Sequence, residues 1–569
     1  MTRGFHGTTR LALALAAALT LLAACESPVI PKPEQPRVEQ SLTREALTDR
    51  MLVEQLRRDW KELKRTDLTL ERRQAVIERY NGHLEVLIAR LRYDVLGEGG
   101  TGGTPFNDIL DFSHTGLPLN SLLTVYDDIV PAKEVDFEYL EEHYGAPGLG
   151  VPMVGIIPAR AVQKLQGKIA AMSSVHTKGT VITLTVVLDF PESPRNAPPT
   201  LRFIPRLEQE TIDVGKLRYQ LAADLSAPME IYWRLTYENK NRFLGLLRPQ
   251  KMRESIGLTS LQPFNPNKIP VVLTHGLLSD ARTFAQLVNR LYVDPDIRNN
   301  FQFWYFNYPT GPAWVYNAAA YRAALAAVRK KVDPKHRNRN WDNMVVVGHS
   351  MGGLITHYSQ CVEPWNMLVN GGVVDADSLD ELAKDPDLQE YREQYFFEPV
   401  KAGMVVYFAT PHRGSPMADF GIVRLLTKLI ELPFAIVEET INAVTLQPDL
   451  FLLNPDQMKH WFTSVDQLSP DGYSIRGLQG LKMRDVPTFS VIGNRGKYGL
   501  IERSSDGVVP YWSSHINWGE EFIVPESHSV QKHKDTAEYM KIILHEFLQE
   551  HPAVRYSRGS VVTLKQENE

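Results

Sequence analysis

The stretch that decides the fold is NMVVVGHSMGGLIT, residues 343–356. Its first part, NMVVV (343–347), is an apolar, β-branched run with the length of one buried strand. Gly348 and Gly352 flank Ser350, and the apolar residues that follow are typical of a helix. The pattern predicts a strand, a turn too tight for side chains beside the serine, and a helix directly after it. The Ser350 hydroxyl would then stand above the strand's carboxyl end, at a helix N-terminus that favours negative charge.

The same alternation of apolar strands and helices runs through residues 256–552. Continuous apolar strands separated by helices indicate a mostly parallel sheet covered on both faces, an α/β fold. A helix over 313–331 and a final helix that buries Met540 and Phe547 are expected between and after the strands. The other strands are predicted at 269–274 (IPVVLT), 301–307 (FQFWYFN), 404–409 (MVVYFA), 487–492 (PTFSVI) and 520–524 (EEFIV).

Composition narrows the class of protein. The chain has 569 residues, of which 43% are hydrophobic and 23% are charged, ordinary proportions for a globular protein. Its net charge of −5 is too mild to indicate nucleic acid as a partner. Two cysteines are too few for a disulfide scaffold. The sequence holds no HExxH, paired CxxC, EF-hand loop or Gly-rich phosphate motif, so we expect neither a metal nor a cofactor.

The N-terminus is predicted to be a targeting segment rather than part of the fold. Two arginines precede an apolar stretch at 11–24, which is shorter than a membrane-spanning helix. Small residues lead directly into Cys25, as in the lipobox of a bacterial lipoprotein signal, so residues 1–24 would be removed and Cys25 would carry a diacylglycerol. Residues 25–41 are rich in proline and form a tether. Glu26 resembles the sorting pattern for the outer membrane of the cell envelope. A plain secretory signal is the alternative.

Two regions come before the α/β pattern. Residues 42–144 are expected to be largely helical, with Leu84, Leu87, Ile88 and Leu91 on one face and a helix capped at Thr66-Asp67. Residues 145–255 are expected to form a β-rich domain, because they carry β-branched and aromatic runs at 180–188 and 217–235. A tail at 553–569 follows the last helix. Cys361 is expected to be buried in the core.

Three more segments carry chemistry at strand ends: LTHGLL (273–278), SSDGVVP (504–510) and SHSV (527–530). Together with the glycine-flanked Ser350, they resemble the lipase and esterase branch of the α/β-hydrolase fold over residues 256–552. Members of this family carry their catalytic residues in the chain order serine, acid, histidine. The resemblance therefore implies a triad of Ser350, Asp506 and His528, because a serine hydroxyl needs a histidine base that a carboxylate orients.

The resemblance also implies an oxyanion hole. Its backbone N–H donors would be those of Leu277, with Leu278 as the alternative, and Met351. His275 would order the loop by hydrogen bonding or fill the core. His533 is the competitor of His528, but it lies in a stretch that already forms a helix. His412, in the segment PHRGS (411–415), is expected to support the pocket wall.

Two insertions separate Ser350 from Asp506, at 363–400 and 417–480. The second contains an apolar amphipathic stretch, which would be either a cap over a lipophilic acyl pocket or helices that pad the core. We therefore expect a membrane-anchored serine hydrolase that cleaves carboxylic esters of lipids or other hydrophobic molecules. An acyltransferase with the same triad stays open, as does a surface binding or scaffold protein that does not use it.

Overall fold

The computed structural model describes residues 49–96, 111–114, 128–157, 180–192, 198–237, 256–262, 264–385, 389–416, 448–452, 463, 465–496 and 500–555. The predicted signal, Cys25, the tether and most of the insertion at 417–480 lie outside these residues. Among the helices in the described part of the chain, none combines the length and the apolar character that crossing a membrane requires.

A seven-stranded sheet forms the centre of the molecule, with the strand order β10-β12-β11-β13-β15-β17-β18. Strand β10 pairs antiparallel with β12, and all the other pairs are parallel. The predicted strands are confirmed to within one or two residues at each end, and three of them coincide with the prediction. The strands are β10 (Gly257–Ser260), β11 (Ile269–Thr274), β12 (Phe301–Asn307), β13 (Val345–His349), β15 (Met404–Phe408), β17 (Thr488–Gly493) and β18 (Glu520–Val524).

Both faces of this sheet are buried, which explains the continuous apolar runs. Side chains alternate between faces along a strand, so Val346 joins one hydrophobic cluster while Val345 and Val347 join the other. Helices α10 (Trp314–Val332) and α12 (Met351–Tyr358) cover the first face. Helices α8 (Ala285–Tyr292) and α21 (Lys534–Glu550) cover the second, where they pack against each other.

The strand order creates a crevice at the carboxyl end of the sheet. The chain passes from β11 to its neighbour on one side, β12, and later from β13 to its neighbour on the opposite side, β15. Connections that leave two adjacent parallel strands in opposite directions open a gap above their carboxyl ends, where ligands bind in open α/β sheets. In this chain the gap lies between the segments that follow β11 and β13.

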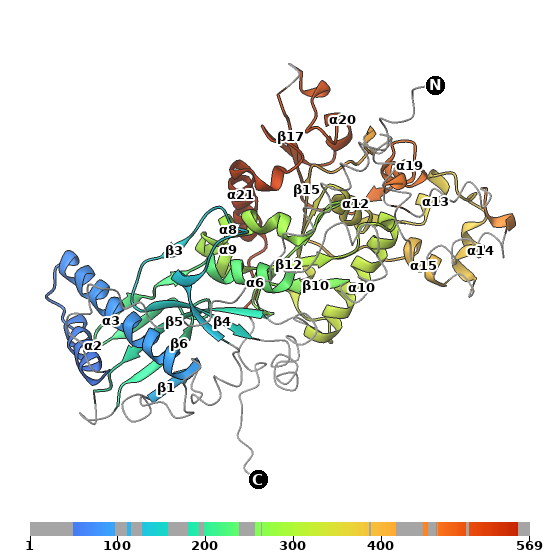
Figure 1. Ribbon diagram of the computed structural model, residues 1–569. Coiled ribbons are helices and arrows are strands. Elements are labelled where there is room, and N and C mark those ends of the chain that lie inside the picture. The colour runs from blue at the N-terminus through green and yellow to red at the C-terminus, as the bar shows by residue number, and fades with distance from the viewer. Residues whose placement is uncertain are drawn as a thin grey trace, which may run out of the picture.

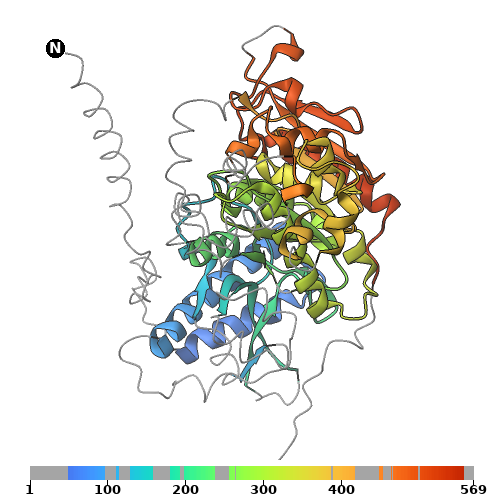
Figure 2. The same cartoon turned by 90° about the vertical axis from the view of Figure 1, so that its right-hand side faces the viewer.

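A second, five-stranded sheet lies in the N-terminal part, with the order β1-β6-β5-β4-β2. Figure 1 shows helices α2 (Asp49–Leu63) and α3 (Leu70–Leu96) on the outer side of this sheet. Figures 1 and 2 both place these blue helices far from the orange and red segments near the C-terminus. The strands are β1 (Asp111–His114), β2 (Asp128–Pro131), β4 (Val151–Ile157), β5 (Thr180–Asp189) and β6 (Thr200–Pro205).

Strand β4 shows how this sheet joins the rest of the molecule. Val151, Met153 and Ile157 pack with α2 and α3, while Val154 and Ile156 point the other way, into the cluster that also buries one face of the seven-stranded sheet. The four leucine and isoleucine positions predicted to form one face of α3 are buried in the first of these clusters, which confirms that prediction. The two sheets therefore share a continuous apolar core.

The structure corrects three details of the sequence analysis. Strands β1 and β2 lie before residue 145, so the β-rich part begins within the region expected to be helical; both strands are only four residues long and partly polar, and they carry no periodic signal. Helix α3 is capped by Thr69, whose hydroxyl accepts from the backbone N–H of Arg72, and not by Thr66-Asp67. Asp67 instead pairs with Arg65.

The third correction concerns residues 217–235, which were expected to carry strand-like runs between turn residues. Residues after 226 form helix α6 (Ala227–Tyr237), which Figure 1 shows between the two sheets. Asp224 caps this helix by accepting from the backbone N–H of Ser226 and of Ala227. The helix is buried on several sides, so its apolar and aromatic residues show no one-sided periodicity.

Two carboxylates fix the loop at residues 138–142, which lies between the N-terminal part and the helices of the central sheet. Glu230 of α6, which is fully buried, accepts from the backbone N–H groups of residues 138–140, and burial raises the pKa of its carboxyl. Glu142 pairs with Arg290 of α8 through two hydrogen bonds of 2.7 and 3.0 Å. The loop between these two anchors therefore packs directly on the helix that follows β11.

Candidate active site

Ser350 occupies the strained turn that the sequence predicts. Its backbone has φ 55° and ψ −124°, in a region that residues with a side chain rarely adopt. The residue links β13 to α12, and its N–H is held by a hydrogen bond of 2.8 Å to the carbonyl of Phe408 in β15. Its exposed fraction is 8%, so the hydroxyl sits in a crevice rather than on the open surface.

The glycines around the serine are required by close backbone contacts. A Cβ at Gly352 would lie 2.2 Å from the carbonyl oxygen of Thr274, at the end of β11. A Cβ at Gly348 would lie 2.5 Å from the carbonyl oxygen of Gly352. Both distances are far below van der Waals contact, so no other residue fits without moving β11 or α12. Strand β11 and the serine turn are therefore packed backbone to backbone.

The structure brings Ser350, His528 and Asp506 together, although 178 residues separate the first two. His528 Nε2 lies 2.8 Å from Ser350 Oγ, and His528 Nδ1 lies 2.7 Å from Asp506 Oδ2. Because a carboxylate oxygen only accepts, Nδ1 carries the ring proton when the histidine is neutral, which leaves Nε2 free to accept the serine proton. The arrangement can activate a serine nucleophile.

Asp506 is held in place by its own loop. Its Oδ1 accepts from the backbone N–H groups of Val508 and Val509, each at 2.7 Å. Its exposed fraction is 2%, and a Cβ at Gly493, at the end of β17, would lie 2.8 Å from the Asp506 Cβ. One carboxylate oxygen is thus fixed by the backbone while the other is directed at the histidine.

The predicted oxyanion donors lie beside the serine. A Cβ at Gly276 would be 2.9 Å from the Ser350 Cβ, which places the loop after β11 against Ser350. The N–H of Leu278 is directed at the hydroxyl of Thr310, at 3.4 Å, so Leu277 is the better candidate of the two. Met351 is the first residue of α12, where backbone N–H groups have no acceptor within the helix.

The remaining histidines have other partners. His533 caps α21, its Nδ1 accepting from the N–H of Asp535, so His528 rather than His533 reaches Ser350. His275 stacks on Tyr308, whose hydroxyl donates to the His275 carbonyl. His412 is buried 3.0 Å from His357, Nδ1 to Nδ1, and burial lowers the pKa of both rings. These positions fit the supporting roles expected for His275 and His412.

Sequence reasoning missed one residue of the site, His349. It is the residue between Gly348 and Ser350, and its side chain contacts the loop that carries His528. Nothing in the pattern singles it out, because the position tolerates many residues in a turn of this kind. Only the tertiary structure shows which segment its ring faces.

Comparisons with known proteins give distant likenesses only. No family model and no curated protein matches the chain. Among solved structures it is similar to lipase BlEst2 of Bacillus licheniformis in its mature form, with 15% identity, 50% of this chain and 97% of that chain covered, and a TM-score of 0.28. A lipase-esterase related protein from Clostridium acetobutylicum shares 12% identity over 50% and 98% of the chains, with a TM-score of 0.25.

An enol-lactonase from Burkholderia xenovorans is similar at 13% identity over 50% and 92% of the two chains, with a TM-score of 0.24. The chain's own topology decides the assignment. The sheet is parallel except for one antiparallel strand, and a strained serine links a strand to a helix. The residues that meet at this serine follow the chain order Ser350, Asp506, His528. The chain has the α/β-hydrolase fold. The seven-stranded sheet is its hydrolase sheet.

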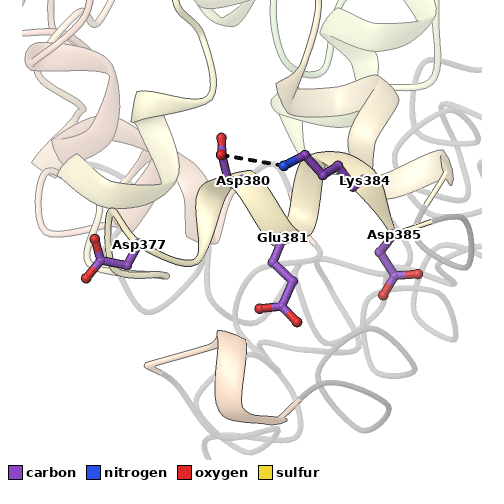
Figure 3. Close-up of a pocket in the computed structure, with 5 residues that line it drawn as sticks. All are labelled: Asp377, Asp380, Glu381, Lys384 and Asp385. Carbon is purple, nitrogen blue, oxygen red and sulfur yellow. Dashed lines mark ion pairs between the residues drawn. The ribbon is translucent and has the colours of Figure 1, made fainter.

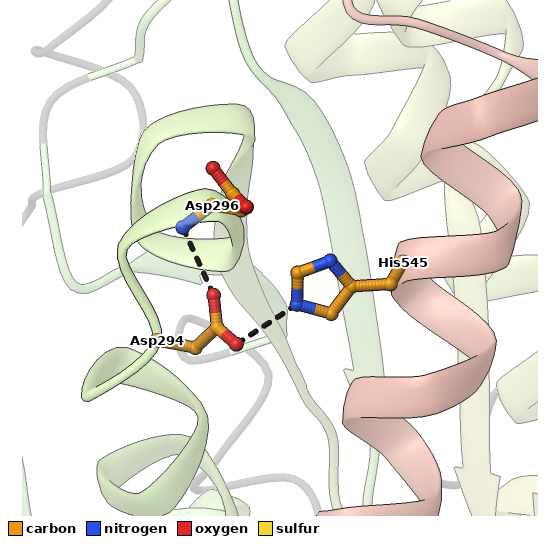
Figure 4. Close-up of side chains that lie close together, drawn as sticks. All are labelled: Asp294, Asp296 and His545. Atoms are coloured by element: carbon orange, nitrogen blue, oxygen red, sulfur yellow. Dashed lines mark hydrogen bonds and ion pairs between the residues drawn. The ribbon is translucent and has the colours of Figure 1, made fainter.

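Two other groups of ionisable side chains have structural explanations. Asp294 caps α9 (Pro295–Asn300) and accepts from His545 of α21 at 2.8 Å, so it ties two helices of the hydrolase domain together (Figure 4). In the first insertion, Asp377, Asp380, Glu381, Lys384 and Asp385 line an open hollow on α14 (Leu379–Lys384). Figure 3 shows Lys384 turned toward Asp380 and the other carboxylates pointing elsewhere. Neither group includes a member of the serine, histidine and aspartate arrangement.

Proposed function

We propose that this protein is a serine hydrolase that cleaves carboxylic esters. The observation that carries the proposal is the unbroken chain of hydrogen bonds from Ser350 Oγ through His528 to Asp506, built on a strained serine turn. A turn with positive φ at a serine is costly, and such strain is found where function requires it. A purely structural serine would not need it.

The reaction follows from these positions. His528 Nε2 takes the proton of Ser350 Oγ as the oxygen attacks the acyl carbon, and Asp506 stabilises the imidazolium that forms. The N–H groups of Leu277 and Met351 would hold the oxyanion of the tetrahedral intermediate. When the intermediate collapses, Nε2 gives its proton to the leaving alcohol. Water, deprotonated by the same nitrogen, then attacks the acyl-serine; the bond to Ser350 Oγ breaks, the acid is released, and Nε2 returns its proton to Oγ.

Hydrophobic esters are the substrate class we propose. One support is the sequence of the 417–480 insertion, whose stretch at 420–444 is apolar and amphipathic. The other is that this insertion begins just after Ser415 in the chain, a residue that contacts the Asp506 loop. Ser415, just before it, donates to the carbonyl of Val508 in the Asp506 loop. An apolar segment that follows Ser415 in the chain would favour an acyl chain over a polar leaving group.

A lipid anchor at Cys25 is part of the same proposal, with the chain held in the bacterial cell envelope at the outer membrane. It rests on the apolar stretch and small residues before Cys25. Metabolic labelling with an alkyne fatty acid tests it directly. We expect label in the wild-type chain and none in Cys25→Ser, and label that persists in the variant would rule the anchor out.

The function is tested with p-nitrophenyl esters of increasing acyl length. We expect turnover that improves with chain length, and a loss of about 10⁶-fold in Ser350→Ala with no loss of stability, because the substitution removes a single oxygen and leaves the packing of the turn unchanged. A fluorophosphonate probe should label the wild type and not the variant. Equal activity in both proteins would show that Ser350 is not the nucleophile. Labelling without hydrolysis, but with transfer to an added alcohol, would identify an acyltransferase.

A further inference from the structure

His349 lies where three segments of the proposed site meet. It is bonded in the chain to Ser350, and its Nε2 lies 2.8 Å from the carbonyl oxygen of His528. A Cβ placed on Gly276, in the loop that would hold the oxyanion, comes within 3.1 Å of its Nδ1. Its ring also packs on the ring of His528, with the two centroids 5.0 Å apart. One side chain thus touches the nucleophile turn, the base loop and the oxyanion loop.

The direction of the hydrogen bond follows from the chemistry of its two ends. A carbonyl oxygen only accepts, so Nε2 of His349 must carry a proton. Burial lowers the pKa of the His349 ring to about 3, so the ring is neutral at any pH at which the enzyme would work. A neutral ring with a proton on Nε2 has none on Nδ1. The side chain is therefore a donor in one fixed tautomer.

The other anchors of the base loop act further along the chain. Thr536 donates to the carbonyl of Val530, Gln531 donates to the hydroxyl of Thr283, and Arg290 donates to the carbonyl of Lys532. All of them hold the turn that begins two residues after His528. The bond from His349 acts on His528 itself, at the backbone carbonyl of the residue whose ring must meet both Ser350 and Asp506.

We infer that His349 is a positioning residue, which fixes the distance between base and nucleophile by tying the backbone of His528 to the serine turn. The inference rests on the proposed function. His349 touches no reacting atom on this account, and it acts only through His528. A shift of 1 Å between base and nucleophile is enough to slow a reaction of this kind by about 100-fold.

The decisive comparison is between His349→Gln and His349→Met. The two replacements have nearly the same length and are both uncharged, but only glutamine offers an N–H at the place of Nε2. We expect His349→Met to lower kcat for a p-nitrophenyl ester by at least about tenfold with KM nearly unchanged. His349→Gln should restore most of kcat. His349→Leu serves as a second variant without a donor. Thermal unfolding of all three variants shows whether a loss of kcat comes from a displaced His528 or from loss of the fold.

Hydrogen exchange of the peptide that covers residues 525–533 gives a readout that needs no substrate. We expect faster exchange there in His349→Met and His349→Leu than in the wild type and His349→Gln. If the wild type hydrolyses no ester, the proposed function fails, and exchange still decides whether His349 holds the loop. Equal kcat and equal exchange in the glutamine and methionine variants would overturn the inference.

Discussion

The His83–Asp59 pair between α2 and α3 and the His528–Asp506 pair beside the hydrolase sheet have the same internal geometry. In both, Nδ1 lies 2.7 Å from Oδ2. The side-chain exposed fractions are 22% and 3% in the first pair and 21% and 2% in the second. Distance and burial therefore do not distinguish the two pairs.

The surroundings of the two carboxylates differ. Asp59 also accepts from the guanidinium of Arg79 at 2.6 Å, so a permanent cation already balances its charge. Among the described residues, the partners of the Asp506 carboxylate are two backbone N–H groups and His528, so its charge stays available to a histidine that becomes positive. In addition, the second nitrogen of His528 faces a serine hydroxyl on a strained turn. The serine on its strained turn and the carboxylate held by backbone N–H groups distinguish the second pair, while the histidine–aspartate contact alone does not.

The largest effect should come from the base itself. We expect His528→Ala to lower kcat/KM for a p-nitrophenyl ester by about 10⁶-fold, as much as Ser350→Ala, because neither residue activates the reaction alone. His533→Ala should keep most of the activity and lose only about 1 kcal/mol of stability, since His533 caps α21. A dead His533→Ala beside an active His528→Ala would reverse the assignment.

The comparison of the two aspartates is tested by the same substitution in both places. Asp506→Asn should reduce turnover by about 10⁴-fold, because an amide can hold the wrong tautomer of His528. Asp59→Asn should leave turnover unchanged and lower the free energy of unfolding by about 2 kcal/mol, since it weakens the bond from Arg79. Kinetics and urea unfolding of both variants measure this. A loss of turnover in Asp59→Asn would mean that the N-terminal pair contributes to catalysis.

Contacts between the two regions predict a pH effect. Lys268 precedes β11, its Nζ donates to the carbonyl of Arg298, and burial, with the nearby Arg298 and Arg555, lowers its pKa to about 8. Arg298 in turn pairs with Glu210 of the N-terminal part. Above pH 8 the unfolded chain binds a proton at this lysine that the folded chain does not, so stability rises with pH up to about 10.4, the pKa of a free lysine.

Unfolding in urea at pH 7.5 and pH 10, with Lys268→Met as the reference, isolates this contribution. We expect the difference in the free energy of unfolding, wild type minus variant, to increase by about 2 kcal/mol from pH 7.5 to pH 10. Tyrosines that titrate in the same range affect both proteins alike and cancel in the difference. A difference that does not change with pH would show that Lys268 is solvated in the folded protein.

The sequence predicts the hydrolase sheet better than the N-terminal region, for a physical reason. Strands buried on both faces need continuous apolar runs, and β11 and β12, which are buried along their whole length, lie at the residues that the sequence predicts. Helix α6 is buried on several sides, so its sequence lacks the one-sided apolar periodicity that is typical of a helix. The same residues therefore resemble a strand. Ser350, Asp506 and His528 could be predicted as a triad because they lie at strand ends in a fixed order. His349 could not be found, since its role depends on a segment 179 residues away.

The smallest expected effect tests whether the N-terminal region supports the site. Glu142 holds Arg290, and Arg290 donates to the carbonyl of Lys532 in the base loop. We expect Glu142→Gln to lower kcat/KM by about threefold and stability by less than about 1 kcal/mol, because the pair is partly exposed and screened by salt. Asp213→Asn, which breaks the exposed Arg218 pair of the same region, is the matched control and should change neither. Assays at low and high salt measure this effect. The kcat/KM of the wild type should fall toward that of Glu142→Gln as the salt concentration rises. If Glu142→Gln keeps full activity at low salt, the N-terminal region does not support the site.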